Sequence, residues 1–115
     1  MATTKLTIRE YVTAQGVSPF RTWLGRLDIT VRARIQARVL RFESGNLGDC
    51  RGVGLGVWEA RCAFGPGYRV YFARPGSTLI LLLLGGDKSS QRSDIRTAQR
   101  YWAEYLKEHT HGTSK

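Results

Sequence analysis

The sequence has little cysteine, histidine or acidic charge, and it has no long hydrophobic run. Its 115 residues include two cysteines, Cys50 and Cys62, and two histidines, His109 and His111. The cysteine spacing matches neither a metal site nor a redox pair, so we expect reduced thiols, no metal and no cofactor. The longest apolar run, 79–84, is far too short to cross a bilayer, and the first residues lack the apolar segment of a signal peptide. We therefore expect a cytoplasmic protein with no membrane partner.

Basic residues are twice as frequent as acidic ones. The sequence has 18 lysines and arginines against 9 aspartates and glutamates, giving a net charge of +9, and 14 of the 18 basic residues are arginine. Arginine keeps its charge and binds a phosphate group through two parallel hydrogen bonds. Lysine would serve general solubility equally well, so the arginine bias favours a nucleic acid or another acidic partner as the binding target.

The apolar pattern predicts a single domain over residues 1–115. Ser18 followed by Pro19 is typical of a helix start, and Asp28 is placed to cap a second helix over 29–44. The other expected elements are strands at 5–12, near 49–53, at 57–64, 68–74 and 78–84, a helix at 91–108 and a frayed tail at 110–115. This order predicts an α+β fold, in which a small, mostly antiparallel sheet packs against an N-terminal helical hairpin and a C-terminal helix.

Alternation along the hairpin 57–74 separates a core face from an open face of the sheet. The core face is expected to carry Trp58, Ala60 and Cys62, and the other two tryptophans, Trp23 and Trp102, are also expected in the core. The open face carries four polar side chains: Glu59, Arg61, Arg69 and Tyr71. If residues 65–67 form the loop, Arg61 lies opposite Tyr71 at about 5 Å. An adjacent antiparallel strand 78–84 would bring Lys88 and Gln91 to the same end as Arg69.

This cluster has the residue types that RNA cleavage needs. Arg61, Arg69 and Lys88 can stabilise the extra negative charge that develops when a ribose 2′-oxygen attacks its own phosphate. Tyr71 can hold a splayed base by stacking, and Glu59 or Lys88 can act as the base if its pKa is shifted. The alternative from spacing alone is that Arg61 simply pairs with Glu59 or stacks on Tyr71 on a solvated sheet face.

Further candidate RNA-binding residues lie on the two longer predicted helices. Arg34, Arg38 and Arg41 form a basic stripe on helix 29–44, and Gln91 and Arg92 begin the last helix. The stripe is either an ordinary solvated face or a contact surface for RNA phosphate or an acidic protein segment.

Several blocks in order give a resemblance over residues 10–106. They are Gly16-x-Ser18-Pro19-Phe20-x-x-Trp23-Leu24-x-x-Leu27-Asp28, Arg32-Ala33-Arg34-Ile35, Gly45-Asn46-Leu47-Gly48-Asp49, Phe64-Gly65-Pro66-Gly67-Tyr68-Arg69-Val70-Tyr71-Phe72 and Leu82-Leu83-Leu84-Gly85-Gly86-Asp87-Lys88-Ser89-x-Gln91-x-x-Asp94-Ile95. The sequence resembles the phage-type RelE/HigB-like toxins, also described as addiction module killer proteins. The resemblance implies the RelE fold and the toxin of a type II toxin–antitoxin system, a metal-independent endoribonuclease that cuts mRNA on the ribosome. It also implies an antitoxin with a helix-turn-helix domain.

The resemblance assigns roles to two residues and departs from the superfamily at one place. The arginine before the Gly-Tyr-Arg turn corresponds to Arg61, and the basic residue after the last strand corresponds to Lys88. The superfamily's catalytic tyrosine is replaced near Ile95, and the histidines of some HigB members are absent. Two alternatives therefore stand beside the ribonuclease: a gyrase poison like the ParE toxins of the same fold, and a non-catalytic RNA-binding module.

Overall fold

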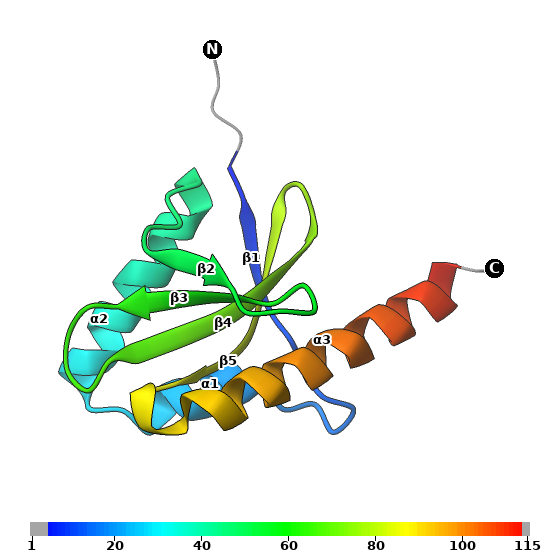
Figure 1. The fold of residues 1–115 in the computed structure, drawn as a ribbon. Helices are drawn as coiled ribbons and strands as arrows, with labels where there is room; N and C mark the ends of the chain where they lie inside the picture. Colours follow the sequence, from blue (N-terminus) through cyan, green and yellow to red (C-terminus); the bar gives the residue numbers. More distant parts are fainter. Residues whose placement is uncertain (1–4, 114–115) are drawn as a thin grey trace, which may run out of the picture.

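The computed structural model describes residues 5–113, and the side chains of residues 5–109. Five strands form one mixed sheet in the order β1-β5-β4-β3-β2 (Figure 1). The strands are β1 (Thr7–Glu10), β2 (Cys50–Gly52), β3 (Trp58–Cys62), β4 (Tyr68–Gly76) and β5 (Leu79–Gly86). Strand β1 runs parallel to β5, and every other pair is antiparallel, which confirms an α+β fold with a mostly antiparallel sheet.

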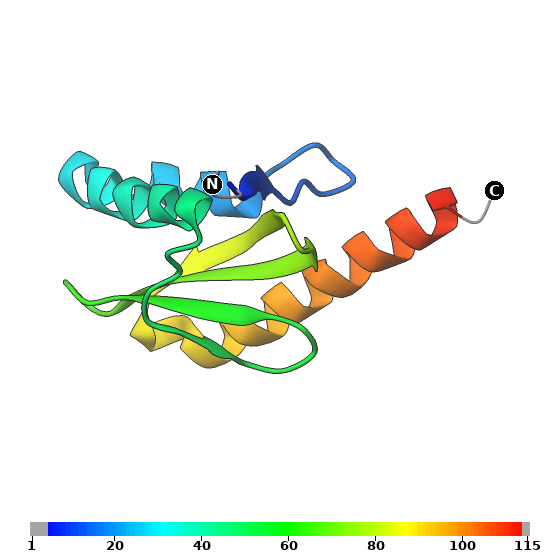
Figure 2. The same ribbon diagram turned by 90° about the horizontal axis from the view of Figure 1, so that it is seen from above.

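Helices cover both faces of the sheet (Figure 2). One face carries α1 (Pro19–Gly25), α2 (Ile29–Leu40) and the short 3-10 helix η1 (Arg41–Ser44); the other carries α3 (Gln91–Thr113), which follows η2 (Lys88–Ser90). Buried residues accordingly form two clusters, one around Phe42 and Phe72 beneath α1 and α2, and one around Tyr71 and Leu83 beneath α3. The sheet face expected to be open is covered over much of its extent, because α3 packs across β5 and β4.

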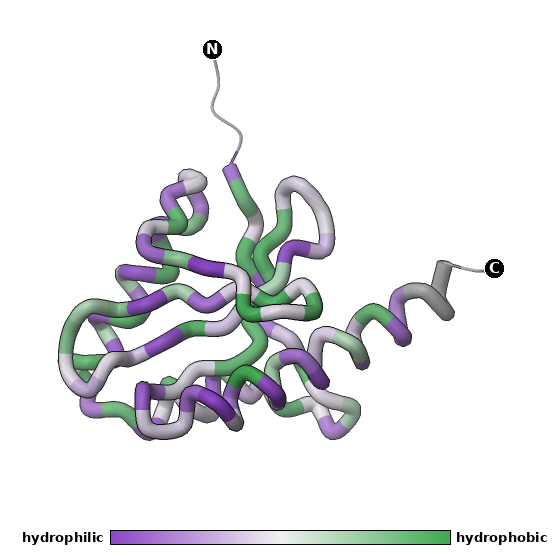
Figure 3. Tube along the Cα trace, viewed as in Figure 1, coloured by the Kyte–Doolittle hydropathy of each residue, from purple (hydrophilic) through white to green (hydrophobic). Residues whose placement is uncertain are grey.

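The predicted helix starts are confirmed. The Ser18 hydroxyl accepts a hydrogen bond from the Arg21 N–H, and the Asp28 carboxylate accepts one from the Thr30 N–H. Helix α2 alternates hydrophilic and hydrophobic residues along its length, as a helix packed on one side must (Figure 3).

Helix α3 continues to Thr113, so the tail expected to fray from Thr110 is helical; residues 114–115 of that expectation lie outside the described residues. No helix among residues 5–113 is both long and apolar enough to cross a membrane.

The register of the β3–β4 hairpin differs by two residues from the expected one. Arg61 lies opposite Arg69, and Glu59 lies opposite Tyr71. The connection is longer than the three residues expected, because the ladder ends at Cys62 and the Phe64 N–H donates to the Cys62 carbonyl in a tight turn. A shift of two preserves the alternation, so each side chain still points to its predicted side.

Trp58 is not in the core as expected: 40% of it is exposed, whereas its neighbour Val57 is 1% exposed. The cause is local. Trp58 lies opposite Gly52 on β2, which offers no side chain to pack on, while Val57 lies in the cluster beneath α3. Trp23 and Trp102 do pack against the two buried clusters, so that part of the prediction is confirmed.

Candidate functional site

A carboxylate buried between the sheet and α3 organises the polar side chains of β3 and β4. Glu59 is fully buried. It accepts hydrogen bonds from Arg51 Nε at 3.0 Å, Gln91 Nε2 at 2.8 Å and the Tyr71 hydroxyl at 3.2 Å. Arg69 Nε lies 3.5 Å from the same carboxylate, an ion pair without hydrogen-bond geometry. Four side chains therefore converge on Glu59, and they come from β2, β4 and the first residue of α3.

This environment fixes the charge state of Glu59. Burial alone would raise the pKa of its carboxyl group, but the hydrogen bonds from Gln91, Arg51 and Tyr71 and the charge of Arg51 together lower it below its usual value. A lowered pKa and full burial make Glu59 a weak and inaccessible proton acceptor, which opposes the role of base expected for it.

Tyr71 is also placed differently from the expectation. Its side chain is fully buried beneath α3. Burial, together with the charge of Glu59 and the hydrogen bond to it, raises the pKa of the Tyr71 phenol. A buried ring cannot stack on a base from outside, so the expected stacking role is wrong for this structure, and Tyr71 instead holds Glu59 in place.

The three predicted cations Arg61, Arg69 and Lys88 do gather at one end of the sheet. Arg69 is 7% exposed, and its Nη1 donates to the Gly67 carbonyl at 2.6 Å. Lys88 begins η2 beside the same turn, since a Cβ built on Gly67 would lie 3.5 Å from Lys88 Cβ and 3.0 Å from Arg69 Nη1. The expectation that Lys88 emerges at the Arg69 end is confirmed.

Arg61 is the exposed member of this group and has its own counterion. Its Nε lies 3.2 Å from the carboxylate of Asp49, the residue just before β2, and both side chains face solvent. Arg61 and Arg69 line one hollow of about 230 Å³, together with Asp49 and Gly67. Neither Asp49 nor Arg51 was predicted as part of the site, although both lie in the short strand predicted near 49–53 and Asp49 ends one of the blocks that carry the resemblance.

The arginines of α2 border a second, larger hollow that adjoins the first. This hollow of about 440 Å³ is lined by Arg34, Arg38, Arg41 and Arg61, and it shares Asp49 with its neighbour. The guanidinium of Arg34 lies over the Phe64 ring, 3.9 Å from its centroid. The expected stripe is therefore only partly a solvated face.

Gln91 and Arg92 differ in what they contact. The Gln91 amide is occupied by Glu59, so Gln91 supports the buried network and is only half-exposed. Arg92 is exposed on the first turn of α3 and is available to a partner.

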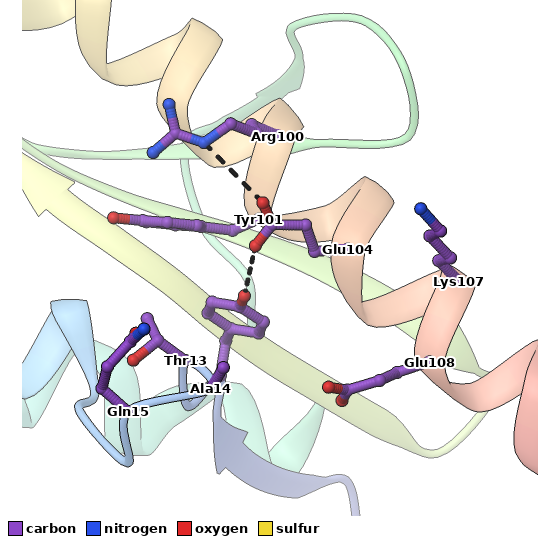
Figure 4. Close-up of a pocket in the computed structure, with 9 residues that line it drawn as sticks. Thr13, Ala14, Gln15, Arg100, Tyr101, Glu104, Lys107 and Glu108 are labelled. Atoms are coloured by element: carbon purple, nitrogen blue, oxygen red, sulfur yellow. Dashed lines mark hydrogen bonds and ion pairs between the residues drawn. The ribbon is translucent and has the colours of Figure 1, made fainter.

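A third hollow, larger than these two, lies away from the arginines, between the end of β1 and the middle of α3 (Figure 4). It measures about 720 Å³ and has the acids Glu104 and Glu108 balanced by the bases Arg100 and Lys107. The Tyr11 hydroxyl donates to Glu104 at 2.9 Å across it. Because its acidic and basic side chains balance, this hollow does not attract a polyanion. The hollow beneath α2, with four arginines and one aspartate, does.

The structure thus defines a small α+β domain with an arginine-rich surface at one end of its sheet. No family model matches the sequence. The chain is similar to an uncharacterized protein of Haemophilus influenzae, with 43% identity over 81 residues that cover 70% of this chain and 82% of that protein. The chain belongs to the same family as that protein.

Proposed function

We propose that this protein has the RelE-like fold and is the toxin of a type II toxin–antitoxin system, acting in the cytoplasm as a metal-independent endoribonuclease on mRNA at the ribosome. In this proposal a helix-turn-helix antitoxin holds it inactive. The sequence blocks that resemble the RelE/HigB-like toxins support the class. The arginine and lysine residues at the β3–β4 turn support the chemistry.

The observation that carries the proposal is the pairing of Arg61 directly opposite Arg69. Like charges facing each other across two strands destabilise a sheet. Here each arginine has a separate counterion, Asp49 for Arg61 and Glu59 for Arg69, so the two cations remain side by side. A destabilising arrangement of this kind is typical of a functional site, and both arginines line the hollow of about 230 Å³, where the oxygens of a phosphodiester could meet them.

In the proposed reaction the ribose 2′-hydroxyl loses its proton to solvent water, its oxygen attacks the adjacent phosphorus, and the 5′-oxygen of the next nucleotide leaves. Arg61 and Arg69 stabilise the charge that grows on the phosphoryl oxygens. Arginine does not release its proton, so the ammonium of Lys88 is the group that protonates the leaving oxygen. Glu59 and Tyr71 are positioning residues: they hold Arg69 and the start of α3 through the buried network.

Growth arrest and RNA cleavage test the proposal together. Brief induction of the wild-type protein in a bacterium is expected to stop growth and to produce mRNA cuts, mapped by primer extension, at codon-phased positions. Arg61→Ala and Lys88→Ala are expected to abolish both effects while leaving the folded structure unchanged, because both side chains are exposed. Arg96→Ala, on the exposed side of α3, is the matched loss of one positive charge and is expected to arrest growth normally.

The alternatives predict different results. A gyrase poison would arrest growth with DNA damage signals, without mRNA cuts, and with no loss of effect in a variant that carries both Arg61→Ala and Lys88→Ala. A non-catalytic RNA-binding module would leave mRNA intact. Either outcome would overturn the ribonuclease proposal.

A further inference from the structure

Arg38 is a buried cation without a carboxylate partner. It is 8% exposed, on the side of α2 that faces the sheet. Of the ion pairs found among the described residues, none includes Arg38. Its Nε and Nη2 donate to the carbonyl oxygens of Arg61 and Asp49, both at 3.4 Å, which is at the long limit for hydrogen bonds. A buried charge with so little compensation is costly unless an anion completes the site.

The space next to Arg38 is suited to an anion. Arg38 lines the 440 Å³ hollow, and three further arginines line it: Arg34, Arg41 and Arg61. The single carboxylate there, on Asp49, is already paired with Arg61. Neither Arg34 nor Arg41 has an ion-pair partner among residues 5–113. The wall of the hollow is therefore strongly positive.

The guanidinium of Arg38 lies close against the backbone of a glycine. A Cβ built on Gly48 would lie 2.9 Å from Arg38 Nη2 and 3.0 Å from Arg38 Cζ, and Gly48 has a φ of +67°. The Phe42 ring lies beneath the same group, with the guanidinium carbon 5.4 Å from its centroid. Arg38 is thus held in one place at the floor of the hollow rather than extended into solvent.

We propose that the hollow beneath α2 is a phosphate-binding site built around Arg38. Its planar group can bind two oxygens of a phosphate at once, and Arg34 and Arg41 can neutralise the remaining charge. The argument for a phosphate site rests on Arg38 and the arginines around it, and it does not depend on the proposed function. That its phosphate belongs to RNA, one that is bound but not cut, rests on the proposed function. The hollow shares Arg61 and Asp49 with the smaller one, so a strand bound at Arg61 and Arg69 can continue directly to Arg38.

Thermal unfolding with inorganic phosphate tests the site without any cleavage. The wild type is compared with Arg38→Met and with Arg96→Met, which removes the same charge from an exposed position on α3. At ionic strength matched with chloride, phosphate is expected to raise the Tm of the wild type and of Arg96→Met but not of Arg38→Met. Without phosphate, Arg38→Met is expected to be at least as stable as the wild type, because it removes an uncompensated buried charge.

Two results would overturn the phosphate site: an equal phosphate-dependent rise of Tm in all three proteins, or no rise in the wild type. If Arg38→Met does not fold, the exposed lining variants Arg34→Met and Arg41→Met replace it, and each is expected to reduce the rise. An unchanged rise in both would count against the site equally.

A non-cleavable 2′-O-methyl oligonucleotide identifies the source of the phosphate. For the wild type and Arg96→Met, the logarithm of the binding constant is expected to fall linearly with the logarithm of the salt concentration. Arg38→Met is expected to make this fall shallower, by about 0.7 in the magnitude of the slope. It is also expected to reduce the affinity by at least about tenfold. An unchanged slope together with a lost phosphate effect would assign the site to a free phosphate compound and would overturn the RNA assignment. If both binding results hold but mRNA stays intact, the proposed function fails and the phosphate site stands.

Discussion

At the scale of single residues, Glu59 is the charged group on which the polar interior depends. Replacing it with glutamine in Glu59→Gln leaves Arg69 buried without a counterion, so we expect a loss of about 2–4 kcal/mol in the free energy of unfolding. Chemical denaturation measures this loss. The matched variant Tyr71→Phe removes one hydrogen bond from the same carboxylate and is expected to cost about 1 kcal/mol. Equal stability of Glu59→Gln and the wild type would contradict the account.

The pH dependence of stability follows from the same residue. The pKa of Glu59 is lower in the folded protein than its ordinary value of 4.5, so the carboxylate stabilises the fold at neutral pH. This stabilisation is complete above the unfolded-state pKa and is lost as pH falls through the folded-state pKa. We expect the wild type to lose stability on acidification below about pH 4.5, and Glu59→Gln to lose less over the same range.

Tyr11 gives a prediction at the alkaline end. Burial, and then the hydrogen bond and charge of Glu104, raise the pKa of its phenol from 10.0 to about 12. A phenol that is harder to ionise in the folded state stabilises the protein below pH 10 and loses that effect between pH 10 and 12. In an ultraviolet titration of phenolate, Tyr11→Phe is expected to remove one late-ionising group. It is also expected to cost about 1 kcal/mol at neutral pH.

Much of the candidate site could not be predicted at this scale, because the burial of a polar residue depends on elements distant in sequence. Alternation correctly grouped Glu59 with Tyr71 on one face of the sheet, and the two do contact. Alternation along the hairpin gave no sign that α3 would cover that face, because it describes only how the hairpin's own residues divide between the two sides. Arg61, Arg69 and Lys88 were grouped correctly because their positions at strand ends depend mainly on local pairing.

At the scale of elements, α1 packs tightly against the sheet where Trp23 lies on Gly85 of β5. A Cβ at position 85 would overlap the indole ring. Gly85→Ala is therefore expected to destabilise the protein by about 1–3 kcal/mol through overpacking. Gly76→Ala is the control, because nothing lies within 4 Å of a Cβ there, and it is expected to change stability by less than about 0.5 kcal/mol. Urea denaturation of both variants makes the comparison, and equal costs would refute the steric explanation.

The elements themselves were predictable where local chemistry determines them. Ser18 and Pro19 define the start of α1, and the continuous apolar run of β5 was correctly predicted to form a strand. The hairpin register was wrong because turn geometry decides it: Gly65 and Gly67 both have positive φ, and the connection is longer than the glycine–proline–glycine run suggested. The parallel partner of β1 was not predicted, since no local pattern encodes pairing with a strand near the other end of the chain.

At the scale of the whole molecule, that parallel pair makes folding depend on a distant contact. Thr7 pairs with Leu79, so about 70 residues of chain must be closed into a loop before β1 can join the sheet. We expect the local hairpins β3–β4 and β4–β5 to form first and β1 to dock late. In folding kinetics, Ile8→Val is expected to give a φ-value below about 0.3 and Val70→Ala a higher one. The reverse order would refute this sequence of events.

The facing arginines Arg61 and Arg69 of the β3–β4 hairpin limit the thermal stability that this protein can reach while it keeps both of them. A library randomised at positions 61 and 69 and sorted only for heat resistance is expected to discard at least one of the two arginines in favour of a β-branched or acidic residue. The same library sorted for growth arrest, the effect proposed for this protein, is expected to retain both. Different residues recovered from the same library under the two conditions would show that this hairpin gives up thermal stability in favour of the proposed activity.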